Sequence, residues 1–210
     1  MSFLADKCLI SPFTEDVRQA CLPFTCGSED MDEFYTKDFA DYAFYLMGKS
    51  YCFRLKDDLR QIVCAFTISN DSIRIYDLPR SRRDYMKSIT HHEKQLRRYP
   101  GVLIGRLAVA KGFANKGIGS EVLSFIKDLF SDPEIQTGCR FVIVDAVNTP
   151  EILSFYQKNN FVFLFTTEQQ EDIYTYPPKN DEERKVREKQ PHHLQTRLMY
   201  YDLLDLKAKE

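Results

Sequence analysis

Two glycines, Gly117 and Gly119, lie where an apolar run and a short loop lead into an amphipathic helix. The first backbone N–H groups of a helix have no partner within it, and the helix dipole gives that end a partial positive charge. A phosphate group binds well there, and glycines let it approach the backbone closely. The spacing therefore predicts a phosphate cradle, although tight packing of the loop on a sheet explains the glycines equally well.

Two common phosphate motifs are excluded by the same residues. A P-loop places Gly-Lys-Ser/Thr after four intervening residues, whereas Lys116 precedes the glycines here. The dinucleotide fingerprint needs further glycines and a later acidic residue for the ribose, which the sequence lacks.

The elements that must position this loop follow from the hydrophobic pattern. Apolar runs predict strands, and helical spacing predicts helices over residues 28–46, 117–131 and 149–159. The predicted strands cover residues 8–10, 50–55, 61–69, 102–110, 141–147, 161–165 and 196–204. This alternation favours a three-layer α/β domain with a mixed sheet, and we expect a single domain over residues 1–210.

Composition narrows the class of protein. The 210 residues are 43% hydrophobic and 29% charged, with a net charge of −2, which gives no general case for nucleic acid or a membrane. No signal peptide and no apolar run of ~18 residues is present. The six cysteines form no CxxC pair, so we expect reduced thiols in the cytoplasm. The histidine pairs 91–92 and 192–193 lack metal-ligand spacing, and we expect surface histidines and no metal site.

Charge is uneven along the chain. Residues 80–98 carry seven Lys or Arg against two acids, which predicts either contact with RNA phosphates or a solvated insertion that pairs with the acidic helix of residues 28–46. Residues 177–193 are charged and bounded by prolines, which predicts a mobile, solvated loop. Arg106 lies in an otherwise apolar strand, so it either pairs with a carboxylate or faces a substrate.

The glycine loop is part of a longer sequence pattern that resembles a known family. RLAV and KGIGSEVL (residues 106–123) are followed by VDA and FYQKNNF (residues 144–161). Over residues 101–166 this pairing resembles the GNAT superfamily of acyl-CoA N-acyltransferases. The resemblance implies a centrally splayed sheet and acetyl-CoA as the acyl donor to an amine acceptor. A non-catalytic acyl-CoA-binding module on the same scaffold is the alternative.

The resemblance assigns residues to the cofactor. Backbone amides of the loop would hold the pyrophosphate, and Ala114 departs from the family's Gln or Arg at the first position. The end of the strand over residues 107–109 would pair with the pantetheine arm. The implied cofactor-binding residues are Leu107, Ala108, Val109, Ala114, Asn115, Lys116, Gly117, Ile118, Gly119, Ser120 and Asn148.

Tyr156 occupies the position of the family's usual general acid. A phenol with a pKa of ~10 is near enough to a thiol at ~8.5 to give the leaving thiolate a proton. The alternative is an ordinary core aromatic on a helix face. The strand over residues 102–109 lacks the glutamate that many relatives use as a base. This favours an acceptor of low pKa, such as an α-amine at ~7.7–8.0, over a lysine at ~10.4.

A narrower resemblance concerns the toxin-type GNAT proteins. Phe24-x-Cys26-Gly27 before the acidic helix, Leu78-Pro79 and Tyr99-Pro100 are similar to their N-terminal half. Those relatives acetylate aminoacyl-tRNA, which implies a tRNA contact through residues 80–98. The chain is longer than expected of such toxins, chiefly through residues 80–98 and 177–193. The sequence does not fix the oligomeric state, and a homodimer stays open.

Overall fold

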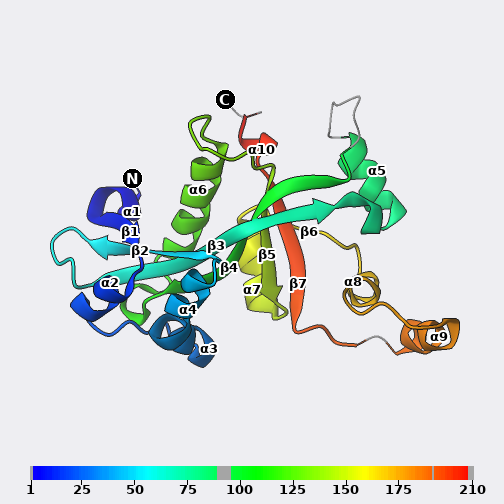
Figure 1. Cartoon of the computed structure of the whole chain (residues 1–210), viewed down its shortest axis with the longest axis horizontal. Coiled ribbons are helices and arrows are strands. Elements are labelled where there is room, and N and C mark those ends of the chain that lie inside the picture. The colour runs from blue at the N-terminus through cyan, green and yellow to red at the C-terminus, as the bar shows by residue number, and fades with distance from the viewer. Residues whose placement is uncertain (1, 89–95, 191, 208–210) are drawn as a thin grey trace. The chain divides into compact units, whose positions relative to one another are not determined.

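A computed structural model of the protein describes residues 2–88, 96–190 and 192–207. The chain forms two compact units, residues 1–70 with 103–137 and residues 71–102 with 138–210 (Figure 1). The strands follow the order β1-β2-β3-β4-β5-β7-β6 in one mixed sheet, which confirms the predicted α/β class. Strands β3 (Ile62–Arg74) and β4 (Arg98–Val109) each pass through both units.

In the first unit, β1, β2 and β3 pair antiparallel in that order. Besides parts of β3 and β4, the elements of this unit are α1 (Phe3–Lys7), β1 (Cys8–Pro12), α2 (Glu15–Ala20), α3 (Glu29–Glu33), the π-helix η1 (Phe34–Asp38), α4 (Phe39–Phe44), β2 (Lys49–Leu55), the 3-10 turn η3 (Lys111–Phe113) and α6 (Ile118–Ser131). Among the described residues, no helix combines the length and apolarity needed to cross a membrane.

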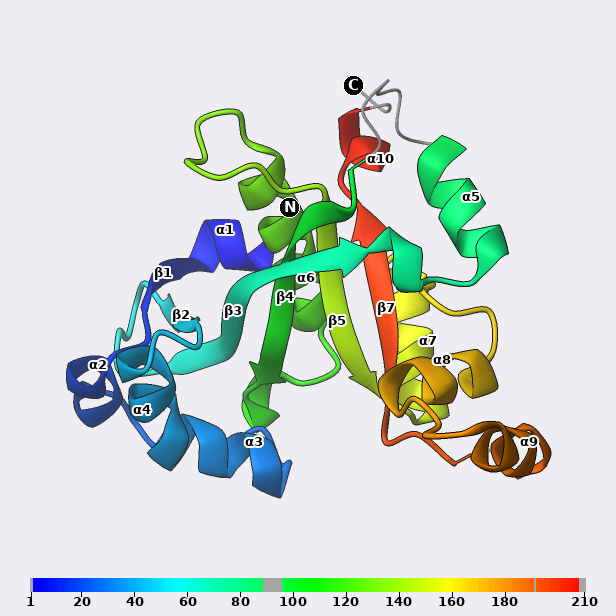
Figure 2. The same ribbon diagram turned by 45° about the vertical axis from the view of Figure 1, so that its right-hand side comes forward.

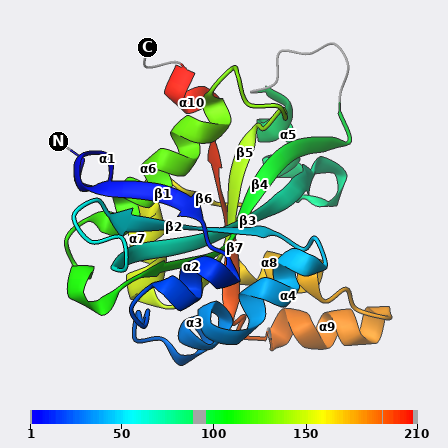
Figure 3. The ribbon, with the colours of Figure 1, turned by 60° about the vertical axis from the view of Figure 1, so that its left-hand side comes forward.

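Helices cover both faces of the first unit's strands (Figure 3). Cys52 lies directly opposite Ala65, and both join the core formed with the α2–α4 segment. On the other face, the rings of Phe53 and Phe66 lie 5.2 and 6.2 Å from that of Phe125 on α6. Because side chains alternate along a strand, these strands contribute to a separate core on each face. Helix α6 packs on the face opposite to α2–α4.

The predicted helix over residues 28–46 is interrupted by a π-turn. In a π-turn the N–H of residue i+5 bonds to the carbonyl of residue i, and here the Phe39 N–H donates to the Phe34 carbonyl. This turn places both side chains on the same face of the helix. Both rings are therefore buried, at 5% and 2% exposure. The helix ends at Phe44, earlier than predicted, because Leu46 takes a left-handed conformation with φ 57° before Gly48 is reached.

The second unit is built on β5 and β7. Its elements besides parts of β3 and β4 are the 3-10 turn η2 (Ile75–Asp77), α5 (Arg80–Ser88), β5 (Phe141–Val147), α7 (Pro150–Lys158), β6 (Val162–Phe163), α8 (Glu168–Thr175), α9 (Asp181–Lys189), β7 (Thr196–Asp202) and α10 (Leu204–Lys207). Strand β7 runs antiparallel to both β5 and β6, and β5 and β7 lie side by side in Figure 2.

The two faces of β5 differ in what covers them. Tyr201 lies opposite Val142, and its ring contacts Phe161, whose ring lies 5.4 Å from that of Tyr156 on α7. This is the α7 face. Asp145 lies opposite Leu198 and points the other way, because side chains alternate along a strand.

The loop predicted over residues 177–193 is wrong for residues 181–189, which form α9. The Asn180 side chain caps this helix by accepting from the Glu183 N–H at 2.8 Å. Acidic residues fill its first turn, basic residues fill its last, and Arg184 pairs with Glu188 one turn on. Local capping and charge order make a helix here without an apolar stripe, which is the signal that the sequence pattern depends on.

The basic segment over residues 80–98 begins as helix α5, in which Met86 is fully buried. Residues 89–95, including His91 and His92, lie outside the described part of the chain. All six cysteines are free thiols. Within the described ranges, no group of three His, Cys, Asp or Glu side chains could hold a metal ion.

Glu121 on α6 joins helix α1 to the first unit. Its carboxylate accepts from the Ser2 hydroxyl and the Leu4 N–H at 2.8 Å each, and from the Phe3 N–H at 3.1 Å. Burial alone would raise the pKa of Glu121, but the hydrogen bonds from Leu4, Ser2 and Phe3 outweigh it and hold the pKa below its ordinary value. The charged carboxylate therefore stabilises the folded state.

Glu121→Gln is expected to lower the free energy of unfolding by about 1–2 kcal/mol at pH 7. Because the folded-state pKa is the lower one, the stabilisation is complete above the unfolded pKa of ~4.3 and is lost as pH falls below it. Urea titrations of both proteins at pH 7 and pH 3.5 measure this, with the exposed Glu182→Gln as control. A deficit that does not shrink in acid would contradict the ionic origin.

Candidate functional site

The N-terminus of α6 is open. Gly117 is the N-cap residue with φ 81°, a left-handed conformation that favours glycine, and no side chain caps the helix. Among the described residues, no carbonyl accepts from the N–H groups of residues 115–120. A Cβ built on Gly117 meets nothing within 4 Å. The bare amides and the free space beside them fit a phosphate group.

Glu121, the acidic residue in the first turn of α6, bonds to helix α1 and not to the N-terminus of its own helix. Its carboxylate accepts from the N–H groups of α1. Lys116 is exposed, donates to the Gly112 carbonyl at 2.8 Å and lies 5.4 Å from the centre of the Phe113 ring. The local charge at the helix start thus favours an anion.

The end of β4 leads into this loop. Ala108 is 3% exposed and belongs to the core of the first unit, while Leu107 and Val109 are half-buried. The Ala110 N–H donates to the Val63 carbonyl at 2.9 Å, and η3 follows at once. The predicted pantetheine-binding strand end and the predicted cradle are therefore continuous parts of one unit.

Arg106 has the carboxylate partner that its place in an apolar strand requires. Its Nε lies 3.9 Å from Asp30 Oδ2, and its guanidinium lies 5.1 Å from the centre of the Phe34 ring. Nη1 donates to the Gly105 carbonyl at 2.9 Å. Asp30 is exposed, so this pair is weak and its partners can exchange for a ligand.

Tyr156 lies on α7 between two phenylalanines. Its ring is 5.1 Å from that of Phe155 and 5.4 Å from that of Phe161. Burial raises the pKa of Tyr156 to about 12, so the phenol stays protonated across the physiological range. Among the described residues, its hydroxyl has no hydrogen-bond partner, which leaves the O–H available as a donor.

Asn148 follows β5, and its side chain is already engaged. Its Nδ2 donates to Glu168 Oε1 at 2.9 Å and to the Leu194 carbonyl at 2.8 Å, and its backbone N–H donates to the Gln195 carbonyl. Only the amide oxygen is left for a ligand. The predicted cofactor contact through Asn148 stays a prediction, and in the structure this residue ties β5 to the segment that leads into β7.

A cavity of about 200 Å³ lies on the face of β5 away from α7. The exposed residue Asp145 contributes a carboxylate to its lining, and no described residue donates a hydrogen bond to it or forms an ion pair with it. The lining residues, which define the Asp145 cavity, are Asp145, Phe165, Glu171, Tyr174, Thr175, Tyr176, Leu194, Gln195, Thr196 and Leu198.

The second acid of the Asp145 cavity is compensated. Glu171 is 4% exposed, and its carboxylate accepts from Arg197 Nε at 2.7 Å and from the Leu198 N–H. Burial raises the pKa of Glu171, against the lowering effect of Arg197. Asp145 is thus the acid of this cavity that lacks a counter-charge.

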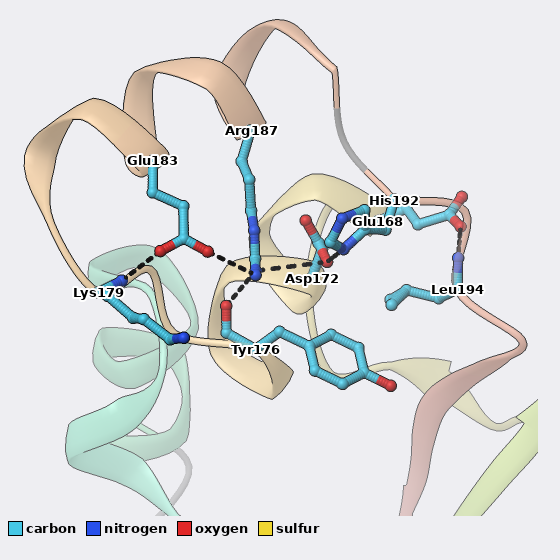
Figure 4. Close-up of polar contacts among 8 residues, drawn as sticks. All are labelled: Glu168, Asp172, Tyr176, Lys179, Glu183, Arg187, His192 and Leu194. Carbon is cyan, nitrogen blue, oxygen red and sulfur yellow. Dashed lines mark hydrogen bonds and ion pairs between the residues drawn. The ribbon is translucent and has the colours of Figure 1, made fainter.

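A polar network holds the outer wall of the cavity in place (Figure 4). Arg187 of α9 donates to the Tyr176 carbonyl and lies 3.9 Å from Asp172, which is fully buried. His192 Nδ1 lies 3.2 Å from the same carboxylate, and the Leu194 N–H donates to Glu168 at 2.7 Å. Because Tyr176 and Leu194 line the cavity, α9 shapes it without entering it.

The predicted site residues fall into two groups. Arg106 and the residues of 107–120 belong to the first unit, and Asn148 and Tyr156 belong to the second. Asp145, in the second unit, was given no role from the sequence. The signal was present, because a charged residue in the apolar run FVIVDAV needs an explanation just as Arg106 does.

No protein family model and no curated protein matches the sequence. Several solved structures match its fold. A tyrosine-to-phenylalanine mutant of KacT is 15% identical with a TM-score of 0.66, covering 98% of this chain and 100% of that one. AtaT complexed with acetyl-methionyl-tRNAfMet is 14% identical with a TM-score of 0.63, and the match covers 96% of this chain and 98% of that one. AtaTR bound with acetyl-CoA is 16% identical with a TM-score of 0.66, and the match covers 97% of this chain and 98% of that one. The resemblance to toxin-type GNAT proteins is confirmed at the level of the fold.

Proposed function

We propose that this protein is an N-acetyltransferase that uses acetyl-CoA and acts on a primary amine by direct transfer. The observation that carries the proposal is the bare N-terminus of α6, where Gly117 has a positive φ and the amides of residues 115–120 have no acceptor among the described residues. Solved structures with the same fold include AtaTR bound with acetyl-CoA. The bound thioester would supply an activated acetyl group.

The chain's own residues divide the work of binding and proton transfer. The amides of residues 114–120 would hold the pyrophosphate, the backbone of Leu107, Ala108 and Val109 would hold the pantetheine arm, and Asn148 would offer its amide oxygen. Tyr156 would donate its phenolic proton to the leaving sulfur. Its unpartnered hydroxyl supports this role over that of an ordinary core aromatic.

The acceptor favoured by the sequence is an α-amine of low pKa. No carboxylate lies on β4 between Leu103 and Val109, so the strand offers no base to deprotonate a lysine. Arg106, with its weak and exposed partner Asp30, would be free to meet an anionic part of the acceptor.

Acetylation of aminoacyl-tRNA is the second candidate, and one feature of the second unit favours it. An open groove of about 850 Å³ shares Phe165, Tyr174 and Thr175 with the Asp145 cavity and extends to Leu78 and Pro79, directly before the basic helix α5. Helix α5 carries Arg80, Arg82, Arg83 and Lys87. AtaT, of the same fold, has been solved with acetyl-methionyl-tRNAfMet.

One assay tests both candidates. Thiol release from acetyl-CoA is measured with charged tRNA, peptides and polyamines as acceptors, and calorimetry measures acetyl-CoA binding without an acceptor. Transfer to peptides alone would reject the tRNA candidate, particularly if charged tRNA fails at low salt, where phosphate contacts are strongest. Binding without transfer to any amine would instead support a non-catalytic acyl-CoA-binding module.

A further inference from the structure

Asp145 is a carboxylate in the lining of a cavity, and it has no partner among the described residues. It interrupts the apolar strand β5 and is solvent-exposed, whereas its neighbours Val144 and Ala146 are buried, and no described residue bonds to it. Because Asp145 is exposed, its carboxylate can be reached by a ligand from solvent. A ligand that brings a positive charge would compensate its charge.

The groups that face Asp145 leave its charge unbalanced. Asp71 on β3 is a second, exposed acid, and Glu171 from α8 is neutralised by Arg197 of β7. Tyr174 and Tyr176 contribute neutral phenols. Although Asp145 is exposed, desolvation by the surrounding cavity walls and then the charge of Asp71 raise its pKa, which makes its carboxylate a better proton acceptor.

The walls of the Asp145 cavity suit an organic ammonium group. Tyr174 and Tyr176 are 36% and 53% exposed and offer aromatic rings, which attract cations, whereas Phe165 is fully buried behind them. Two leucines contribute further apolar surface. A hydrated metal ion would find only Asp145 as an uncompensated ligand there. The cavity therefore favours an amine that carries an apolar or aromatic side chain.

We infer that Asp145 binds the ammonium group of the acceptor in this cavity and accepts its proton. The inference rests on the proposed acetyltransferase function and identifies the base that β4 lacks. In this step one N–H bond of the ammonium breaks, an O–H bond forms on the Asp145 carboxylate, and the electron pair stays on nitrogen. The amine is then neutral and nucleophilic.

Asp145 and the α7 helix lie on opposite faces of β5 within one unit. The group that takes a proton from the incoming amine is thus separated from the group that gives one to the leaving sulfur. An α-amine of pKa ~8 is still mostly charged at pH 7, so a base helps even with this acceptor.

Asp145→Asn keeps the shape of the side chain and removes its charge. With an amino acid amide as acceptor we expect kcat/KM at pH 7 to fall by about 10²-fold, which is typical of a lost general base. The deficit should shrink to within about tenfold at pH 9, where the amine is neutral without help, and it should be larger for the lysine ε-amine of pKa ~10.4. Asp145→Glu should retain the wild-type pH profile.

Asp16→Asn, an exposed aspartate on α2, is the control and should behave as wild type. A deficit in Asp145→Asn that is the same at every pH and for every amine would indicate a merely structural role and overturn the inference. Wild-type rates for that variant would overturn it as well.

Amine binding without transfer separates this inference from the proposed function. NMR titration of the unliganded protein with the same amino acid amide should show binding that Asp145→Asn loses by about tenfold or more. If the wild type binds the amide through Asp145 but transfers no acetyl group, the proposed function fails and the ammonium site stands. If the wild type transfers acetyl and the variant binds and reacts normally, only the inference fails.

Discussion

Tyr156→Phe is expected to lower kcat by about 10²- to 10⁴-fold, because it removes the proton donor for the leaving sulfur and little else. The hydroxyl has no partner among the described residues, so its loss breaks no structural hydrogen bond. The ring remains between Phe155 and Phe161, and the packing of α7 is kept. Acetyl-CoA affinity should therefore change little.

The raised pKa of Tyr156, about 12, bears on how it acts. A phenol of that pKa stays protonated throughout the physiological pH range, so the donor is always present there. It is also a weaker acid than a free thiol. Efficient donation therefore requires that the same buried surroundings raise the pKa of the leaving thiol, since desolvation disfavours both anions.

Single-turnover thiol release measures the chemical step, and calorimetry measures acetyl-CoA binding. Tyr45→Phe is the matched control, because Tyr45 is 69% exposed at the end of α4. Turnover of Tyr156→Phe at the wild-type rate would show that another group or water protonates the sulfur. A loss of affinity as large as the loss in rate would indicate that the hydroxyl acts in binding.

The central elements could be predicted because local and periodic signals agree there. Residues 141–147 form β5 as the apolar run predicts. Helix α7 begins at Pro150, with Thr149 as its N-cap, where Pro at the first helical position predicts it. Gly117 is the N-cap residue of α6, and a glycine at a loop-to-helix boundary is likewise a local signal. The positions of the cradle and of Tyr156 in the chain follow from these elements.

Features that depend on distant contacts could not be predicted. Whether Arg106 pairs with a carboxylate depends on Asp30, which folding of the first unit brings to it. The Asp145 cavity exists because α8 and the segment before β7 cover one face of β5. Its outer wall is held by Arg187 of α9, in a segment whose composition alone predicts a loop.

Gly117→Asp should weaken acetyl-CoA binding by about 10²-fold while leaving the fold intact. Asp and Asn tolerate the left-handed conformation of this position better than other residues do, and both are good N-cap residues. The left-handed backbone is strained for both residues, so the free energy of unfolding should fall by about 1–2 kcal/mol for Asp and Asn alike. The added Cβ enters open space.

The introduced carboxylate acts against a phosphate in two ways. It repels a diphosphate directly, and it competes for the amides of Gly119 and Ser120, which the proposed cradle offers to the ligand. Gly117→Asn competes for the same amides without the charge. We expect Kd for acetyl-CoA to rise by about 10²-fold for Asp and by about tenfold for Asn, which is the difference that a close like charge produces.

Salt concentration isolates the electrostatic part of this difference. Calorimetry at low and at high salt should find the two variants converging as salt rises, because ions screen the repulsion between carboxylate and phosphate. Gly112→Ala is the control, since its added Cβ also meets nothing within 4 Å and its φ is not positive. If Gly117→Asp and Gly117→Asn bind acetyl-CoA equally at low salt, the pyrophosphate does not lie at the start of α6, and the glycines there serve packing alone.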